Sequence, residues 1–351
     1  MGTGTGTGPD GDGAASPGAA SLLARVVRKS SMEYVSLGQT GIRVSKVGLG
    51  VLTMGPLQAD LPLERGAYLI RRALAMGINL FDTAQLYRTY PHLREGLRRV
   101  PDGGAVLISK AYAHARDGMS AALAEAEAET GRRIDIFMLH EQESVHTLAG
   151  HRPALEYLVE ARAEGRIGAV GLSTHRVAGV RAGTIDPRIQ VIMAIVNLRG
   201  LGIGDGTAAE MLEAVGEARK AGKGVIAMKL LGGGALTGAG NDPAAARNAL
   251  LFARERSGAD AFLLGAKSVA ELSFGRRVLL GLPAGTGLAE RLSRVPKRLH
   301  VDEWCNGCGE CLAACGSGAL RLVEGRAKAG EGCVLCGYCV ARCPDFYLKM
   351  L

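Results

Sequence analysis

The eight cysteines of the chain lie in two closely spaced runs near its C-terminal end. In each run, two, two and three residues separate successive cysteines. The first run is Cys305, Cys308, Cys311 and Cys315, and the second is Cys333, Cys336, Cys339 and Cys343. Thiolates at these intervals are typical ligands of [4Fe-4S] clusters. The spacing therefore predicts two [4Fe-4S] clusters and an electron-transfer role for this part of the chain.

Other uses of these cysteines fit the spacing less well. A structural zinc site joins two Cys-x2-4-Cys pairs across a longer span, so the third cysteine of each run has no place in its tetrahedron. A disulfide framework is typical of secreted proteins, whereas the early apolar stretch "AASLLARVV" is too short for a signal-peptide core. Zinc and an empty module stay open as alternatives to iron and sulfur.

Four polar residues form a second group that could do chemistry: Asp82 in "NLFD", Tyr87 in the stretch that follows, Lys110 in "LISK" and His140 in "FMLH". A phenol has a reference pKa of about 10 and needs a nearby cation to donate its proton near neutral pH. Lys110 can supply that cation, held by an ion pair with Asp82, while His140 orients a carbonyl oxygen. The set suits proton donation to a carbonyl as a hydride arrives at carbon. Each residue alone also has an ordinary structural role, such as capping a helix or packing in a core.

These residues need a scaffold that brings the ends of separate strands together. Short apolar or β-branched runs alternate with longer segments of helical spacing. The runs begin near residues 46, 78, 105, 134, 167, 191, 224 and 261. No Gly-x-Gly-x-x-Gly turn follows the first run, which favours a closed (β/α)8 TIM barrel over a doubly wound sheet. The carboxyl ends of barrel strands converge on one face, where the four polar side chains could meet.

The predicted barrel, residues 32–290, is one of four segments. It opens with a hairpin around "GQTG". Residues 1–31 are rich in glycine and are expected to be a disordered tail, because they offer little apolar surface to bury. Residues 291–300 are a basic linker that contains a proline, and residues 301–351 are a small C-terminal α+β domain that carries the cysteines.

Charge and hydropathy limit the classes of partner. The formal net charge of +8 ignores the negative charge that thiolate-bound clusters add, so it is weak evidence for nucleic acid. No apolar run approaches the roughly 20 residues that span a membrane. We therefore expect neither a nucleic acid nor a membrane as a partner, and a cytoplasmic protein. The basic stretch "RLSRVPKRLH" suits an acidic redox protein as a partner or a solvated linker surface.

The cysteine spacing resembles that of the bacterial two-cluster ferredoxins over residues 301–347. In that family the fourth cysteine of each run binds the other cluster. The resemblance implies one cluster on Cys305, Cys308, Cys311 and Cys343, and a second on Cys333, Cys336, Cys339 and Cys315, within a ferredoxin-like iron-sulfur domain. Gly316 follows Cys315 where ferredoxins usually repeat the proline that follows Cys343.

The order of Asp82, Tyr87, Lys110 and His140 resembles the tetrad of the aldo/keto reductases, and "YVSLGQTGIRVSKVGLG" resembles their N-terminal hairpin and first strand. The likeness runs from about residue 34 to about residue 285. It implies a barrel that binds NADP(H), with Tyr87 as the general acid or base. The expected substrate is a small aldehyde or ketone, or an alcohol in the reverse direction.

The same resemblance implies contacts to the cofactor. They are Ser173 at the carboxamide, Met228 in place of a ring-stacking tyrosine, Gly232 in "LGGGALTGAG", and Lys267 with Ser268 at the adenosine 2′-phosphate. A cation near a phosphate is expected on charge grounds. The chain departs from the family pattern at Thr174, Met193, Phe274 and Gly275.

The two halves together predict an aldo/keto reductase with a fused two-cluster module, as in the iron-sulfur branch of that family. Hydride transfer moves two electrons at once, whereas such clusters pass one at a time, and the chain shows no flavin motif. Two further hypotheses stay open. The protein could be an electron carrier whose barrel binds a ligand or partner without turnover, or the clusters could only stabilise the C-terminal part.

Overall fold

The computed structural model describes residues 1–4, 32–238, 241–283, 285, 287–294 and 297–351. Beyond residues 1–4, the predicted tail lies outside the described residues, as do residues 295 and 296 of the predicted linker. The part Met32–Leu351 forms one compact unit. No helix in the described part of the chain is long and apolar enough to cross a membrane.

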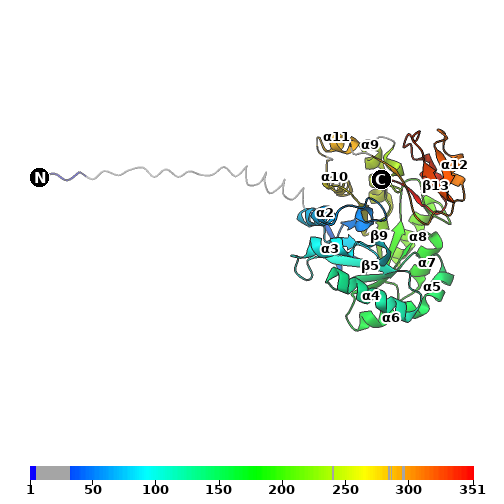
Figure 1. Ribbon diagram of the computed structural model, residues 1–351. Coiled ribbons are helices and arrows are strands. Elements are labelled where there is room, and N and C mark those ends of the chain that lie inside the picture. Colours follow the sequence, from blue (N-terminus) through cyan, green and yellow to red (C-terminus); the bar gives the residue numbers. More distant parts are fainter. Residues whose placement is uncertain (5–31, 239–240, 284, 286, 295–296) are drawn as a thin grey trace. The chain divides into compact units, whose positions relative to one another are not determined.

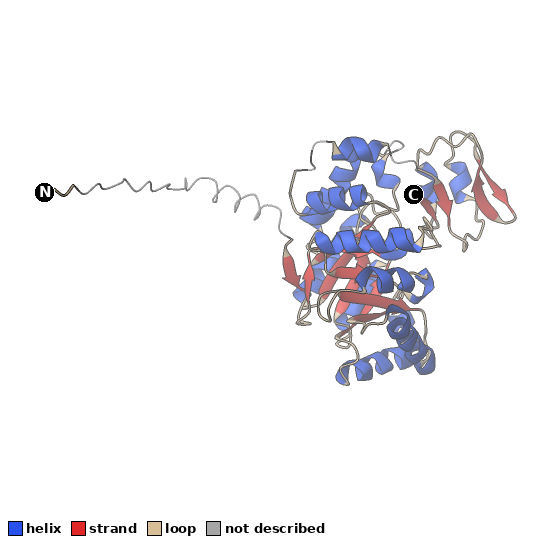
Figure 2. Cartoon of the chain, turned by 60° about the vertical axis from the view of Figure 1, so that its left-hand side comes forward, coloured by secondary structure: helices blue, strands red, loops and turns tan. Residues whose placement is uncertain are grey.

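Eight parallel strands close into a barrel, as the alternating pattern predicts, and Figure 2 shows strands surrounded by helices. The order around the barrel is β10-β3-β4-β5-β6-β7-β8-β9, so the barrel closes between β10 and β3. The strands are β3 (Val47–Gly50), β4 (Leu80–Asp82), β5 (Val106–Ala111), β6 (Ile136–Leu139), β7 (Ala169–Thr174), β8 (Val191–Ile195), β9 (Gly224–Met228) and β10 (Ala261–Gly265). Each strand overlaps one of the predicted runs.

A helix follows each barrel strand, and together these helices cover the outside of the barrel (Figure 1). In helix α2, Leu69, Ile70 and Ala73 are buried because their spacing places them on one stripe that faces the strands. The helices are α2 (Leu63–Ala75), α3 (Tyr90–Leu97), α4 (Arg116–Thr130), α5 (Val145–Gly150), α6 (Arg152–Ala163), α7 (Val177–Ile185), α8 (Ala208–Lys220), α9 (Pro243–Arg256), α10 (Val269–Leu279) and α11 (Leu288–Ser293). Short 3-10 turns are η1 (Val51–Met54), η2 (Gln85–Tyr87) and η3 (Ala235–Thr237).

Alternate strand positions fill the inside of the barrel, because successive side chains of a strand point to opposite faces. Leu80, Ile108 and Met138 belong to this interior cluster. The predicted hairpin, β1 (Tyr34–Ser36) paired with β2 (Arg43–Ser45), adds Leu37 and Val44 to the same cluster. Its turn contacts the residues that precede β9, so the hairpin covers the amino ends of the strands. The opposite, carboxyl end is left for polar side chains.

The cysteine-bearing residues form a small α+β module (Figure 1). Strand β11 (Leu299–Val301) pairs antiparallel with β14 (Leu348–Met350), and β12 (Leu320–Val323) pairs antiparallel with β13 (Arg326–Ala329). The short helices are α12 (Glu310–Ala313) and α13 (Tyr338–Arg342). Helix α11 continues past residue 290 and β11 begins before residue 301, so regular structure enters the predicted linker from both sides.

The module packs on the loops at the carboxyl ends of the barrel strands. The backbone N-H of Met350 donates to the carbonyl oxygen of Gly233 at 2.8 Å, in the loop after β9. A hydrophobic cluster joins Phe346 and Met350 of the module to Leu201 and Leu236 of the barrel. The module therefore covers the same face on which the polar strand ends converge.

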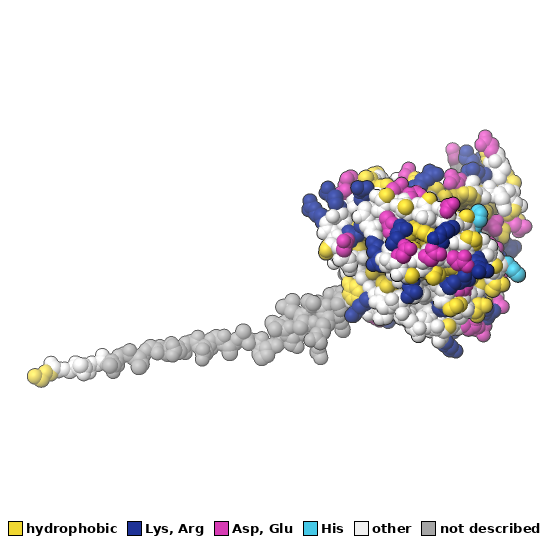
Figure 3. Space-filling view, turned by 90° about the horizontal axis from the view of Figure 1, so that it is seen from below, with side chains coloured by type: hydrophobic (Ala, Val, Ile, Leu, Met, Phe, Trp, Pro, Cys, Tyr) yellow, Lys and Arg dark blue, Asp and Glu magenta, His cyan; other side chains and the backbone are white. Residues whose placement is uncertain are grey.

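Charged side chains of both signs are interspersed on the molecular face seen in Figure 3. Neither Lys and Arg nor Asp and Glu gather there into one continuous patch. The positive formal net charge is therefore not concentrated into a basic surface on this face.

Candidate active site

Strand register brings Asp82 and Lys110 together at the carboxyl end of the barrel. Asp82 lies opposite Ile108 on the neighbouring strand, and Lys110 is the next residue of that strand on the same face. The Lys110 ammonium donates to Asp82 Oδ1 at 2.5 Å and to the carbonyl oxygen of Thr83 at 2.6 Å. The side chains of Lys110 and Asp82 are only 1% and 8% exposed. The predicted ion pair is present.

Burial favours the neutral form of both Asp82 and Lys110. It raises the pKa of Asp82 and lowers the pKa of Lys110, while the contact between the two groups opposes both shifts. A buried pair of this kind is expensive to break, because either partner alone is a buried, uncompensated charge.

We expect Lys110→Met to lower the free energy of unfolding by about 3–5 kcal/mol, because Asp82 then remains buried without its cation. The double variant Asp82→Asn with Lys110→Met should recover a large part of that loss. Chemical denaturation followed by circular dichroism measures both. Equal destabilisation by the single and the double variant would contradict the coupling.

Tyr87 and His140 meet above this pair. Tyr87 is the last residue of η2, which follows β4, and His140 directly follows β6. The Tyr87 hydroxyl lies 3.4 Å from His140 Nε2, and the two rings meet edge to face with their centroids 5.6 Å apart. The Lys110 ammonium lies 5.1 Å from the centroid of the Tyr87 ring. All four predicted polar residues therefore lie in one site.

The electrostatics of Tyr87 differ from the expectation. Burial raises its pKa well above 10, and the charges of Asp82 and Glu141 add to this effect. The Lys110 ammonium, which is bound by Asp82 and a backbone carbonyl, lies over the Tyr87 ring, but the net effect of the surroundings on the pKa of Tyr87 is upward. Tyr87 is therefore firmly protonated at neutral pH. Burial and the neighbouring Lys110 hold the pKa of His140 well below 6.5, so its ring is neutral.

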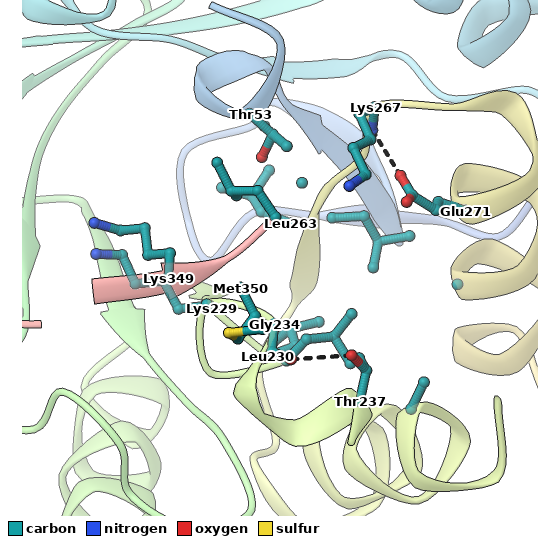
Figure 4. A pocket seen from close by; sticks show the side chains of 18 of the residues that line it. Thr53, Lys229, Leu230, Gly234, Thr237, Leu263, Lys267, Glu271, Lys349 and Met350 are labelled. Carbon is teal, nitrogen blue, oxygen red and sulfur yellow. Dashed lines mark hydrogen bonds between the residues drawn. The ribbon is translucent and has the colours of Figure 1, made fainter. Parts of the chain in front are cut away.

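Two pockets adjoin at Tyr87, whose side chain lines both. The first extends along β9 and β10 and includes Met228, Lys267, Phe274 and Gly275, all of which the resemblance implied near a cofactor. Figure 4 shows this pocket, with the backbone N-H of Lys267 bonded to Glu271 at 2.8 Å. A cation among apolar walls suits a ligand that carries both phosphate and flat rings.

Three other predicted cofactor contacts lie off this pocket. Ser173 is 1% exposed, and its hydroxyl accepts a hydrogen bond from the backbone N-H of Glu141 at 3.0 Å. Ser268 caps helix α10 by accepting from the Glu271 N-H. Gly232 packs against Leu201 and Leu236, whereas the next two glycines reach the pocket. Met193 belongs to the barrel interior, a layer below the strand ends.

The second pocket, between the strand ends and the module, contains charged residues that we did not predict. Lys229 directly follows β9 and Lys349 lies on β14, and Figure 4 shows the two side chains side by side. Glu141 lines the same pocket, and the Tyr112 ring stacks on His140 with centroids 4.3 Å apart. A polar residue at a strand end identified Asp82, and the same signal would have identified Lys229. The contribution of Lys349 depends on how the module docks.

The sequence profile of the Aldo/keto reductase family matches residues 46–271, which is more than half of the chain. The chain belongs to the aldo/keto reductase family. It is an oxidoreductase of the NAD(P)H-dependent type that characterises this family. The matched residues include Asp82, Tyr87, Lys110 and His140, and they end before the cysteine module.

Relatives of this aldo/keto reductase include L-galactose dehydrogenase from Arabidopsis thaliana, which is 27% identical over 227 residues, or 59% of this chain and 68% of the relative. Aldo-keto reductase dtxS3 from Metarhizium robertsii is 29% identical over 98 residues, or 26% of each chain. Among solved structures, aldo-keto reductase AKR11C1 from Bacillus halodurans has a TM-score of 0.59 and 17% identity, covering 75% of this chain and 96% of that one. The structure of a protein from Pseudomonas aeruginosa that is described as a putative aldo-keto reductase has a TM-score of 0.57 and 23% identity, covering 72% of this chain and 95% of that one. The structural likeness supports the fold.

The cysteines of this aldo/keto reductase surround two separate cavities in the module. One is lined by Cys305, Cys308, Cys311 and Cys343, and the other by Cys315, Cys333, Cys336 and Cys339. The last cysteine of each run thus lines the cavity of the other run. This is the partition that the ferredoxin resemblance implies. All eight thiols are free of disulfide bonds.

The spacing of these thiols differs from that of a single-ion site. Within the described residues, no group of three or more His, Cys, Asp or Glu side chains is close enough to hold one metal ion. A four-iron cluster binds each thiolate to a different iron, so its ligands surround a cavity instead of a point.

Proposed function

We propose that this aldo/keto reductase reduces a small carbonyl compound with NADPH, with Tyr87 as the proton donor, and that the reverse reaction oxidises the alcohol. The observation that carries the proposal is the Tyr87 hydroxyl, 3.4 Å from His140 Nε2 at the junction of two pockets. Bound NADPH supplies a hydride to the carbonyl carbon. The first pocket suits the cofactor and the second suits the substrate.

Each polar residue then has a defined task. Tyr87, protonated at neutral pH, gives its proton to the carbonyl oxygen, and the Lys110 ammonium beside its ring stabilises the phenolate that remains. Asp82 keeps Lys110 charged and in place. Neutral His140 holds the carbonyl oxygen through Nε2 without introducing a competing charge.

The direct test is an anaerobic assay of NADPH oxidation with a panel of aldehydes and ketones, with the alcohol products identified by mass spectrometry. Turnover of at least one carbonyl, with stoichiometric alcohol formation, is the expected result. Oxidation of NADPH without any alcohol product would contradict the proposed carbonyl reduction.

Lys267 offers a test of cofactor choice. Its side chain is half-buried in the first pocket, and burial lowers its pKa. We expect Lys267→Met to raise KM for NADPH about 10- to 100-fold, because one charge-assisted contact to the 2′-phosphate is lost. KM for NADH should not change. Lys220→Met, at the exposed end of α8, is the control, and an equal loss for both nucleotides would contradict the assignment.

We further propose that the module holds two [4Fe-4S] clusters, one in each four-cysteine cavity, as a ferredoxin-like domain of residues 301–351. The support is the partition of the thiols between the cavities and the backbone N-H of Tyr347, which donates to Cys343 Sγ at 3.1 Å. Hydrogen bonds to the sulfur ligands tune cluster potentials. Reduced thiols of this kind suit a cytoplasmic protein.

A second candidate function is electron transfer through the module, with the barrel as a ligand site without carbonyl turnover. Each cysteine cavity shares a wall residue with a barrel pocket: Tyr347 lies between the first cavity and the second pocket, and Met350 between the second cavity and the first pocket. Iron-sulfur clusters, when bound, exchange single electrons with a partner.

Anaerobic stopped-flow mixing with NADPH separates the two functions. Bleaching of the iron-sulfur absorbance without added flavin would show that the barrel and the module exchange electrons. Carbonyl reduction with unchanged absorbance would leave the clusters a structural role. Bleaching without any alcohol product would favour the electron carrier.

A further inference from the structure

One cation of the second pocket has no task in the proposed reaction. Lys229 is the first residue after β9, at the carboxyl end of the barrel. Its φ of 56° lies in the left-handed region, which is costly for a residue with a Cβ. Backbone strain of this kind clusters at functional sites, and Lys229 lines both pockets.

The other cations of this pocket have acidic partners: Lys349 donates to Asp302, and Arg176 lies 3.5 Å from Glu143. Burial holds the pKa of His175 well below 6.5, so its ring is neutral. Among the residues that the structure describes, no hydrogen bond or ion pair is found for the Lys229 ammonium. It lies over the ring of Phe346, 4.9 Å from the centroid.

The surroundings make this ammonium costly to keep charged. Burial and the neighbouring Lys349 lower the pKa of Lys229 to about 7. The groups that face it are Lys110 on β5, His140 and Glu141 after β6, His175 after β7, Asp302 after β11 and Lys349 on β14. An anion placed beside Lys229 would offset both burial and the repulsion from Lys349.

The position of Lys229 points to the substrate. Its charge acts on His140 and His175, so the ammonium faces the same pocket as the Tyr87 hydroxyl. In Figure 4 the Lys229 and Lys349 side chains point together away from Lys267, which belongs to the phosphate end of the first pocket. Lys229 is therefore well placed for a group on the substrate side of the reacting carbonyl.

We infer that the carbonyl substrate carries a carboxylate and that Lys229 binds it, so that the enzyme acts on oxo acids or on the matching hydroxy acids. This inference rests on the proposed carbonyl reduction and names its substrate class. Four acidic residues in the described part of the chain line this pocket; Glu143 and Asp302 are paired with cations, Asp345 accepts a hydrogen bond from the Asn306 amide at 3.3 Å, and Glu141 is the one nearest to His140 in the sequence. Its carboxylate, however, accepts a hydrogen bond from Tyr112 at 2.7 Å, which reduces its repulsion of an anion.

Matched probes separate the carboxylate from the carbonyl. 4-Carboxybenzaldehyde carries the anion, and 4-formylbenzamide has nearly the same shape without charge. We expect Lys229→Met to raise KM for the acid about 10- to 100-fold and to leave KM for the amide unchanged, because one charge-assisted contact is lost. Lys220→Met should change neither value.

The dependence on pH gives a second signature. Lys229 is charged below its pKa and neutral above it, so KM of the unaltered enzyme for the acid should rise as pH passes about 7. Lys229→Arg stays charged throughout this range and should remove that rise while it keeps the preference for the acid. Calorimetric titration with 4-carboxybenzaldehyde, without nucleotide, measures the same contact without turnover.

The two proposals fail in different ways. If neither probe is reduced but binding of the acid still depends on Lys229, carbonyl reduction of these probes fails and the carboxylate site stands. If both probes are reduced and Lys229→Met changes KM equally for the acid and the amide, the proposed carbonyl reduction is supported and the carboxylate site is wrong. Absence of both binding and reduction of the acid overturns the inference as well.

Discussion

Replacing Tyr87 with phenylalanine is expected to lower kcat/KM for carbonyl reduction by about 10²- to 10⁴-fold, the usual contribution of a positioned general acid. The substitution removes only the hydroxyl that lies 3.4 Å from His140 Nε2 and keeps the ring that covers Lys110. NADPH binding should be unchanged, since the first pocket keeps its shape. Steady-state kinetics and nucleotide titration of the same sample measure the two effects.

Tyr68→Phe is the matched control, because Tyr68 is half-exposed on helix α2 and lines neither pocket. It should reduce carbonyls at the original rate. Full activity of Tyr87→Phe would show that another group donates the proton. A loss confined to KM would assign Tyr87 to binding instead of proton transfer.

The second large effect concerns Cys343, which lies in the second run but lines the cavity of the first. We expect Cys343→Ala to abolish one cluster and to leave about half of the iron and acid-labile sulfide of the anaerobically purified protein. The module should also unfold at a lower temperature, because metal binding supplies part of its folding energy. The barrel, which has its own hydrophobic cluster, should keep its circular dichroism.

Two further variants decide the pairing. Cys308→Ala removes a neighbour in the same cavity and should eliminate the same electron paramagnetic resonance signal as Cys343→Ala. Cys339→Ala should eliminate the other signal. If Cys343→Ala instead matches Cys339→Ala, each run binds its own cluster and the crossed assignment is wrong. Loss of zinc with no change in iron would replace the iron-sulfur proposal with a zinc module.

Much of the barrel could be predicted because its signal is local. A buried parallel strand reads as a short apolar run, and the alternation of such runs with helical stripes specifies the topology. The same logic identified Asp82, Lys110 and His140, since a polar residue at the end of an apolar run must lie near the carboxyl face. The linker boundaries were less certain, because β11 is short and is defined by its pairing with β14, a distant segment.

The cofactor contacts mark the limit of reasoning from position in the sequence. Ser173 has the residue type that the family resemblance implies, and its hydroxyl also accepts a hydrogen bond from the backbone N-H of Glu141, a neighbour that the sequence does not place beside it. Such outcomes depend on side-chain depth and loop geometry, which a residue type does not specify.

The eight-stranded barrel, the residues at its strand ends and the two cysteine runs are all visible in the amino-acid sequence, because strand period and ligand spacing are properties of neighbouring residues. The upward shift of the Tyr87 pKa and the proximity of Lys229 to Lys349 depend instead on the folded arrangement. Burial raises the pKa of Tyr87. Docking of the module on the barrel brings Lys229 and Lys349 together, although the two residues are far apart in the sequence. Desolvation and long-range electrostatics depend on everything that surrounds a group, so they emerge only once the chain is folded.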